Sequence, residues 1–315
     1  MEVKIKRKQC QLQQLQDSIL TSEDVKRERT YREELEELLN REELMWAQKA
    51  RTKWFLHGDR NTRYFQTVVR QRRSRNRILQ IKDEHRHYID VHEEIEQIFI
   101  DSFQRNFSCN SILTVESIIQ EIRGLSIPSL TDQQVLLLNR GISIFEIEEA
   151  VFQIGPHKAP GLDGIPGFFF QNFWSIIKTD VCNAIQAFFH SGSLFKAFNH
   201  TFITPIPKLP NPEEVSNFRP ISLCNVFYKI ISKILVNRLK PIMDTIITPF
   251  QNAFIKGRNI TDNILLAHEI IDVVRKKRGK RDSYGVLKID VSKAYDRVNW
   301  NFLKAILTVM RFDPK

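Results

Sequence analysis

The segment from Tyr284 to Trp300 constrains the fold more than any other, because a short apolar run leads directly into a helical pattern. The apolar run predicts a strand that ends at Asp290. Ser292 then predicts the cap of a helix that continues through Trp300 to Leu307. The apolar residues of the expected strand are Val286, Leu287, Ile289 and Val291.

A carboxylate at the tip of an apolar strand needs an explanation, because an unpaired charge is costly to bury. Asp290 is exposed, paired with a cation, or held there for a metal ion. Phosphoryl transfer with two Mg²⁺ ions requires several carboxylates that converge on one point. Asp290 supplies one of them, and the sequence alone leaves the three alternatives open.

Positive charge is concentrated in one window of the chain. The 315 residues carry 47 Lys and Arg against 37 Asp and Glu, a surplus of +10. Residues 49–82 hold eleven basic residues and one acid, Asp59, which gives 11 − 1 = +10 for this window alone. Aromatic residues such as Trp54 and Tyr64 are interspersed with them. This mixture favours contact with nucleic acid over a merely solvated face, and the expected contacts are Arg70, Arg72, Arg73, Arg75 and Arg77.

Three regions follow from the pattern along the chain. Residues 1–48 predict one or two amphipathic helices, packed on each other rather than in an intermolecular coiled coil. Residues 49–142 form a basic connector. Residues 143–315 form a third region that begins with Ser143 and Glu146 as a capping box. No run of 18 apolar residues predicts a membrane span, and the four cysteines lack zinc-ligand spacing.

The third region contains further ordered segments. Residues 155–167, rich in Pro and Gly, predict a rigid loop with Lys158 exposed. Lys208 and Arg219 flank a hairpin-like turn, where they either clamp a triphosphate or are ordinary surface cations. A helix over 226–239 is expected to bury Phe227, Ile230, Ile231, Ile234 and Leu235 and to expose Lys229, Lys233 and Arg238. The cation run at 275–281 is consistent with three alternatives of equal weight: a nuclear localisation signal, a nucleic-acid contact or a solvated loop.

Four blocks in this order resemble the fingers and early palm of reverse transcriptases from non-LTR (LINE-type) retrotransposons, particularly the plant kind. They are His157–Gly164, Phe218–Leu223, Gln251–Arg258 and Leu287–Asp296. The resemblance covers residues 143–315, and the segment from Trp54 to Phe65 looks like the connector of plant elements. Leu162 stands where Pro is common in the family.

The resemblance assigns roles to individual residues. Asp290 matches the first metal-binding carboxylate, and the backbone carbonyl of Val291 would contact the same metal ion. Tyr295 matches the aromatic residue beneath the sugar of the incoming nucleotide. Lys208 and Arg219 match residues of the fingers that contact the triphosphate. Gln251 and Arg258 belong to a block but receive no role.

The resemblance implies an α/β (α+β) fold, with right-hand polymerase fingers and a partial palm behind a helical, basic N-terminal region. It implies an RNA-directed DNA polymerase that uses two Mg²⁺ ions, an RNA template, a DNA primer and deoxynucleoside triphosphates, and that works in the nucleus without a membrane. The family's remaining carboxylates come from an Asp-Asp block, and no Asp-Asp dipeptide occurs in this sequence. We therefore expect this chain to be inactive by itself. The alternatives are a non-catalytic RNA- or DNA-binding remnant and a group II intron-type or telomerase-like polymerase, and the oligomeric state is left open.

Overall fold

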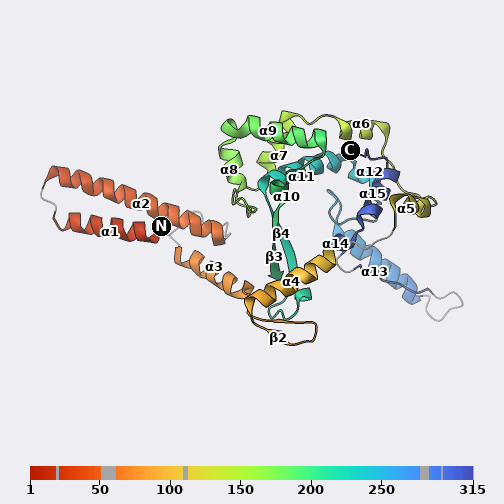
Figure 1. Ribbon diagram of the computed structural model, residues 1–315, viewed down its shortest axis with the longest axis horizontal. Coiled ribbons are helices and arrows are strands. Elements are labelled where there is room, and N and C mark those ends of the chain that lie inside the picture. The colour runs from red at the N-terminus through yellow and green to blue at the C-terminus, as the bar shows by residue number, and fades with distance from the viewer. Residues whose placement is uncertain (19–20, 51–61, 109–112, 277–283, 292–293, 315) are drawn as a thin grey trace. The chain divides into compact units, whose positions relative to one another are not determined.

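The computed structural model describes residues 1–18, 21–50, 62–108, 113–276, 284–291 and 294–314 (Figure 1). These residues form two compact units. Unit 1 comprises Met1–His92 and Ile206–Arg219, and unit 2 comprises Glu93–Pro205 and Pro220–Lys315. The expected mixture of helix and strand is confirmed, with helices dominant. The three regions drawn from the sequence stay predictions.

Unit 1 begins with the two amphipathic helices that the sequence predicted, α1 (Glu2–Gln16) and α2 (Ser22–Ala50), which lie side by side (Figure 1). Four Arg–Glu pairs at a spacing of four residues support α2, including Arg27 with Glu23 and Arg32 with Glu28. The short strands β1 (Ile81–Lys82) and β2 (Tyr88–Ile89) pair antiparallel.

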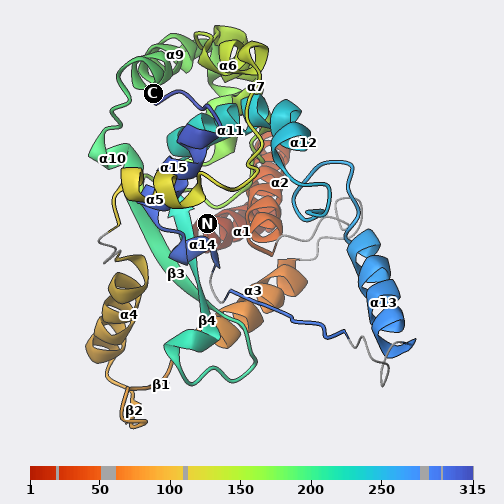
Figure 2. The same cartoon turned by 90° about the vertical axis from the view of Figure 1, so that its right-hand side faces the viewer.

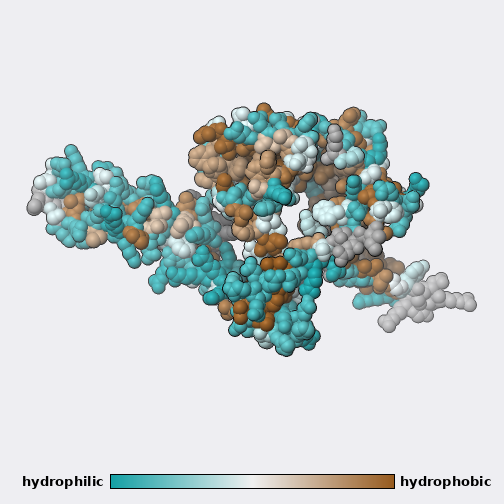
Figure 3. Space-filling view, viewed as in Figure 1, coloured by the Kyte–Doolittle hydropathy of each residue, from teal (hydrophilic) through white to brown (hydrophobic). Residues whose placement is uncertain are grey.

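The basic helix α3 (Thr62–Asn76) packs on the end of α2 through a small core of Ala50, Phe65 and Val69. Figure 3 shows that the surface of α1 to α3 is mainly hydrophilic. Most of the predicted connector phrase, from Trp54 to Asn61, lies outside the described residues.

The main core of unit 2 joins α7 (Ile144–Gln153), α8 (Gly167–Asn172), α9 (Trp174–Ser191) and α11 (Val226–Leu239). Ser143 and Glu146 form the expected capping box at the start of α7. The bounds of α11 match the predicted helix. The completely buried side chains of this core are Ile147, Ala150, Ile185 and Ile230.

Two smaller cores bring the residues around 113–139, which gave no clear sequence pattern, against the C-terminal end of the described chain. Ile118 and Ile122 of α5 (Val115–Ile122) pack on Ala305 of α15 (Trp300–Val309). Leu130, just before α6 (Asp132–Asn139), packs on Ile242 beside α12 (Met243–Ile246). Short apolar helices become recognisable only through these distant partners.

The remaining elements include a hairpin of β3 (Thr201–Pro207) and β4 (Phe218–Cys224), which confirms the predicted turn. The others are α4 (His92–Phe107), α10 (Lys196–Asn199), η1 (Val215–Asn217), η2 (Lys240–Ile242), α13 (Ile260–Lys276) and α14 (Ala294–Arg297). No helix in the described parts of the chain is long and apolar enough to cross a membrane.

The strand predicted at Val286–Val291 is not formed, and this expectation was wrong. Residues 284–291 have no regular structure, and Leu287 and Ile289 are 82% and 77% exposed. A strand exists only when a neighbouring strand accepts its hydrogen bonds, and a local apolar pattern does not supply that neighbour.

The helix predicted to run from Ser292 through Trp300 is also interrupted. Asn299 adopts an extended conformation, and its side chain accepts hydrogen bonds from the amides of Asn301 and Phe302, so it begins a separate helix, α15. An Asn side chain favours this capping position over a helix interior, which explains the break. Ser292 itself lies outside the described residues.

Two assignments on α11 were reversed. Leu235, expected inside, is 45% exposed. Arg238, expected outside, keeps only 9% of its side chain exposed. Its guanidinium donates hydrogen bonds to the carbonyls of Leu138, Arg140 and Gly141 and to both carboxylate oxygens of Glu146. The three carbonyls lie at the end of α6 and just after it, where a helix leaves carbonyls without partners, and Glu146 lies on α7; together these acceptors draw the long side chain inward.

Ile231→Ala tests the assigned core face of α11. Ile231 is 4% exposed, so its truncation leaves a cavity and should reduce the free energy of unfolding by about 2 to 5 kcal/mol. Leu235→Ala removes a similar side chain from the exposed face and should cost less than about 1 kcal/mol. Equal losses in urea unfolding would mean that the helix face is wrongly assigned.

The contact between Glu146 and Arg238 can be tested by replacing Glu146 and measuring how the free energy of unfolding depends on pH. Burial raises the pKa of Glu146, but bonds from Arg238 and from the backbone and hydroxyl of Ser143 outweigh it and lower the pKa from 4.5 to about 2. The ionised carboxylate therefore stabilises the fold above pH 4.5 and loses this contribution as pH falls towards 2.

The wild-type chain should exceed Glu146→Gln in free energy of unfolding at neutral pH. Because other carboxyl groups titrate in both proteins, only the difference between them reports Glu146, and it should shrink below pH 4.5. A difference that stays constant through this range in urea unfolding would contradict the assigned ion pair.

Candidate functional site

The two predicted triphosphate contacts lie near the same end of the β3–β4 hairpin. Lys208 follows β3, and its amide donates to the carbonyl of Asn217 at 2.8 Å. Arg219 follows the buried Phe218 on β4 and is exposed. The Lys208 ammonium donates to the carbonyl of Ser216 at 2.7 Å. Arg219 is thus presented to solvent, whereas Lys208 is already engaged in closing the turn.

The loop at residues 155–167 is ordered by its contact with the start of α11. Gly161 lies so close to Asn225 that a Cβ there would come within 2.1 Å of the Asn225 Oδ1 atom and 2.4 Å of its amide nitrogen. Lys229, which was expected to be exposed, is half-buried: it donates to the carbonyl of Ala159 at 2.8 Å, and burial lowers the pKa of its ammonium group. Lys158 is exposed, as predicted.

Asn225 was not recognised from the sequence, although it lies at the centre of this contact. It is 3% exposed, and its side chain donates to the carbonyl of Ala197 at 3.0 Å. Its Oδ1 atom also accepts from the amide of Asp163 at 3.4 Å. A single amide side chain therefore ties the loop, the segment before β3 and the first turn of α11 together.

The block at residues 251–258 also has a structural explanation. The Arg258 guanidinium donates to the carbonyls of Thr248 and Gln251 at 2.6 and 2.8 Å and to Asp244 at 3.1 Å. It closes the turn that follows α12. The side chain of Gln251 donates to the carbonyl of Ala253 at 3.3 Å.

The residues expected at the metal and at the nucleotide sugar are open to solvent in unit 2. Asp290 and Val291 are exposed, and Tyr295 on α14 is 97% exposed. Their expected roles stay predictions. Two Mg²⁺ ions need several converging carboxylates, and the described residues contain no group of three or more His, Cys, Asp or Glu that could hold a metal ion. The described residues therefore do not fit a two-metal site.

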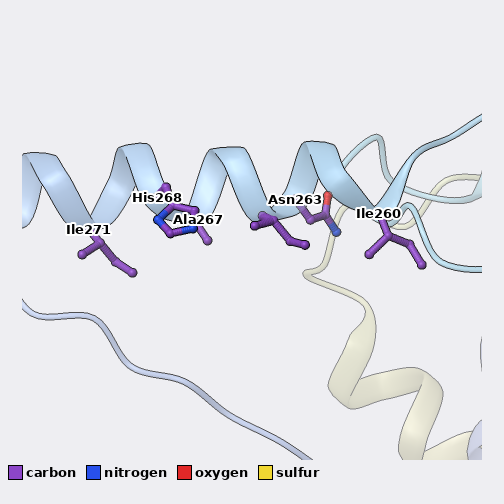
Figure 4. A pocket seen from close by; sticks show the side chains of 6 residues that line it. Ile260, Asn263, Ala267, His268 and Ile271 are labelled. Carbon is purple, nitrogen blue, oxygen red and sulfur yellow. The ribbon is translucent and has the colours of Figure 1, made fainter.

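The helix α13 presents an apolar face that the described residues do not cover. Ile260, Ile264 and Ile271 lie along one side and, together with Asn263, Ala267 and His268, line an open hollow of about 240 Å³ (Figure 4). None of its side chains is buried. The cation run that begins at its end continues outside the described residues.

The predicted nucleic-acid contacts divide into two kinds. Arg72 donates to the carbonyls of Lys49 and Ala50 at 3.3 and 3.1 Å, where α2 ends, so it has a structural role. The other four, Arg70, Arg73, Arg75 and Arg77, are exposed on α3 and just after it. The described residues provide them with no ion-pair partner, so the positive field of this helix is uncompensated there.

Comparison with known proteins finds similarity to one family over part of the chain. Residues 206–315 match the family of reverse transcriptases, described as RNA-dependent DNA polymerases. The match begins in the β3–β4 hairpin and includes Arg219, Asp290 and Tyr295.

Three relatives come from transposable elements. An uncharacterized 149 kDa protein of transposon TX1 from Xenopus laevis is 27% identical over 304 residues, which are 96% of this chain and 23% of the relative. A Pol polyprotein of the type-1 retrotransposable element R2 from Popillia japonica is 29% identical over 51% of this chain and 21% of its own length. A probable RNA-directed DNA polymerase from transposon BS of Drosophila melanogaster is 24% identical over 65% of this chain and 22% of its own length.

The chain thus spans about a fifth of the length of the curated relatives it matches. The match of the last 110 residues and these relatives confirm the resemblance to non-LTR elements that the four sequence blocks indicated. Residues 206–315 are thus similar to reverse transcriptases, and the chain as a whole is similar to proteins of non-LTR retrotransposons.

Proposed function

We propose that this chain supplies the fingers and early palm of a retroelement RNA-directed DNA polymerase. The observation that carries the proposal is the reverse transcriptase match over residues 206–315. The exposed Arg219 on a well-formed hairpin supports it, because a guanidinium can bind phosphate through two parallel hydrogen bonds.

The proposed substrates are an RNA template, a DNA primer and deoxynucleoside triphosphates. Members of the family use divalent metal ions, and we propose Mg²⁺ here, with Asp290 as one ligand. Because the described residues lack a carboxylate cluster, the proposal assigns this chain no complete catalytic step by itself. What its residues contribute is binding and orientation of strand and nucleotide. Nuclear localisation belongs to the same proposal, and cell fractionation with an antibody to the chain tests it.

A second candidate function is a non-catalytic nucleic-acid-binding remnant of such an element. The observation that favours it is the exposure of Asp290 on a segment without regular structure. Both candidates require binding to nucleic acid, and they differ in whether the chain contributes to nucleotide transfer.

Primer extension separates the two within this chain. A displacement of reacting groups by 1 Å can lower the reaction rate by about 100-fold. The loss of a metal-binding carboxylate should lower the rate further. We therefore expect that the purified chain with Mg²⁺ does not extend a primer. Asp290→Asn is the matched control. Extension by the wild-type chain that disappears in this variant would overturn the expected inactivity and support a complete site.

Salt dependence tests whether α3 binds nucleic acid. Replacing Arg70, Arg73, Arg75 and Arg77 by Gln removes up to four phosphate contacts. On single strands each contact contributes about −0.7 to the slope of log K against log salt, so the slope should become shallower by up to about 2.8.

The helix α2 offers a control with the same change in net charge. Arg27, Arg29, Arg32 and Arg41 are each paired with a Glu on the same helix, so replacing them by Gln should leave the slope nearly unchanged. A slope that the α3 variant does not change, or that both variants change equally, would refute the assignment of α3 as the binding surface.

A further inference from the structure

Glu213 makes the contact in unit 1 that joins its most distant sequence segments. One carboxylate oxygen accepts a hydrogen bond from the Lys82 ammonium, and the other accepts from the Tyr88 hydroxyl at 2.9 Å. The backbone carbonyl of Glu213 accepts from the Lys82 amide at 2.7 Å. The Lys82 ammonium also lies 4.8 Å from the centroid of the Tyr88 ring. We call Lys82, Tyr88 and Glu213 the clasp.

The clasp connects the tip of the β3–β4 hairpin, residues 208–217, with the short β1–β2 sheet. Asn217 fixes the tip internally, because its side-chain oxygen accepts from the amides of Glu213 and Glu214 at 3.0 and 3.1 Å. Lys208 closes it through Ser216. The tip is therefore a well-bonded loop that the clasp holds at one residue.

The clasp residue Lys82 lies close in sequence to the basic helix α3. Lys82 and its neighbour Ile81 form β1, which begins five residues after the end of α3 at Asn76. Ile81 is completely buried, and β1 pairs with β2 in a defined register. Figures 1 and 2 both show the C-terminal end of α3 beside the tip of the hairpin. A short chain segment, residues 77–80, thus links α3 to the strand that the clasp bonds to the tip.

We propose that Glu213 is a positioning residue that couples nucleic-acid binding on α3 to the order of the hairpin tip. The proposal rests on the proposed function, because it takes single-stranded nucleic acid as the ligand of α3. It goes beyond that function by assigning a physical connection between the strand-binding helix and the residues beside Arg219. A strand that binds α3 restricts the motion of β1, and the clasp passes this restriction to the tip.

The clasp is suited to this role because its contacts are moderate in strength. The Lys82 and Glu213 side chains are 24% and 50% exposed, so the fold does not depend on them as it depends on a buried core. The tip can therefore open locally in the free chain and become more protected when α3 is occupied.

Hydrogen exchange of the tip amides, measured on the 315-residue chain with and without a single-stranded oligouridylate, tests the proposal. In the wild-type chain the oligonucleotide should slow exchange of residues 208–217 by about fivefold. Glu213→Ala and Lys82→Met should bind the oligonucleotide with affinity within about twofold of wild type but lose this slowing.

Glu214→Ala is the matched control, since it removes the same charge from the adjacent position. Glu214 contacts Ser216 within the tip and takes no part in the clasp. This variant should keep the oligonucleotide-dependent slowing. A merely structural role for Glu213 would change exchange in the free chain but would not abolish the response to the oligonucleotide.

The outcomes distinguish the coupling from the proposed function. Slowing that persists in Glu213→Ala, or that is lost equally in Glu214→Ala, would overturn the coupling. Binding to the wild-type chain without any slowing at the tip would overturn the coupling alone. Failure of the wild-type chain to bind the oligonucleotide would refute the proposed nucleic-acid function and the coupling with it.

Discussion

Three arginine side chains bind carbonyl groups at or just after the ends of helices. A helix leaves its last carbonyls without internal partners, and buried carbonyls without partners are costly. Arg238 binds three carbonyls at the end of α6 and just after it. Arg72 binds the last two carbonyls of α2, and Arg258 binds carbonyls in the turn that follows α12. In each case a planar group with five donors satisfies several acceptors at once.

This use of arginine changes how the charge of the chain is interpreted. A basic surplus indicates an anionic partner only to the extent that the cations are free to reach it. Arg238 and Arg72 are committed to the fold, whereas Arg70 and its exposed neighbours on α3 are available. Of the eleven basic residues in the window, the four exposed arginines on α3 and just after it are therefore the expected nucleic-acid contacts.

Unit 2 combines firmly packed and uncovered parts. The loop at Gly161, α10 and α11 are joined through Asn225. By contrast, α13 and residues 284–291 expose apolar side chains that are normally covered. Asp290 lies in this second part. The chemistry that its position suggests depends on carboxylates that the described residues do not bring to it.

The sequence by itself determined the local features. The capping box of Ser143 and Glu146, the bounds of α11, the hairpin between Lys208 and Arg219 and the two N-terminal helices all depend on residues within a few positions of one another. The order of four short blocks also indicated the resemblance to reverse transcriptases of non-LTR elements, because each block is a local string of residues.

Only the tertiary structure decided which side chains are inside and which cations are free. Leu235 is exposed and Arg238 is buried, the reverse of what the sequence pattern predicted. The acceptors that bury Arg238 lie about a hundred residues away in sequence, so the periodicity of α11 does not reveal them. The strand expected at Val286–Val291 fails for the same reason, since strand pairing is a contact between distant segments. The clasp between Lys82 and Glu213 joins residues 131 positions apart, and only the folded chain brings them together.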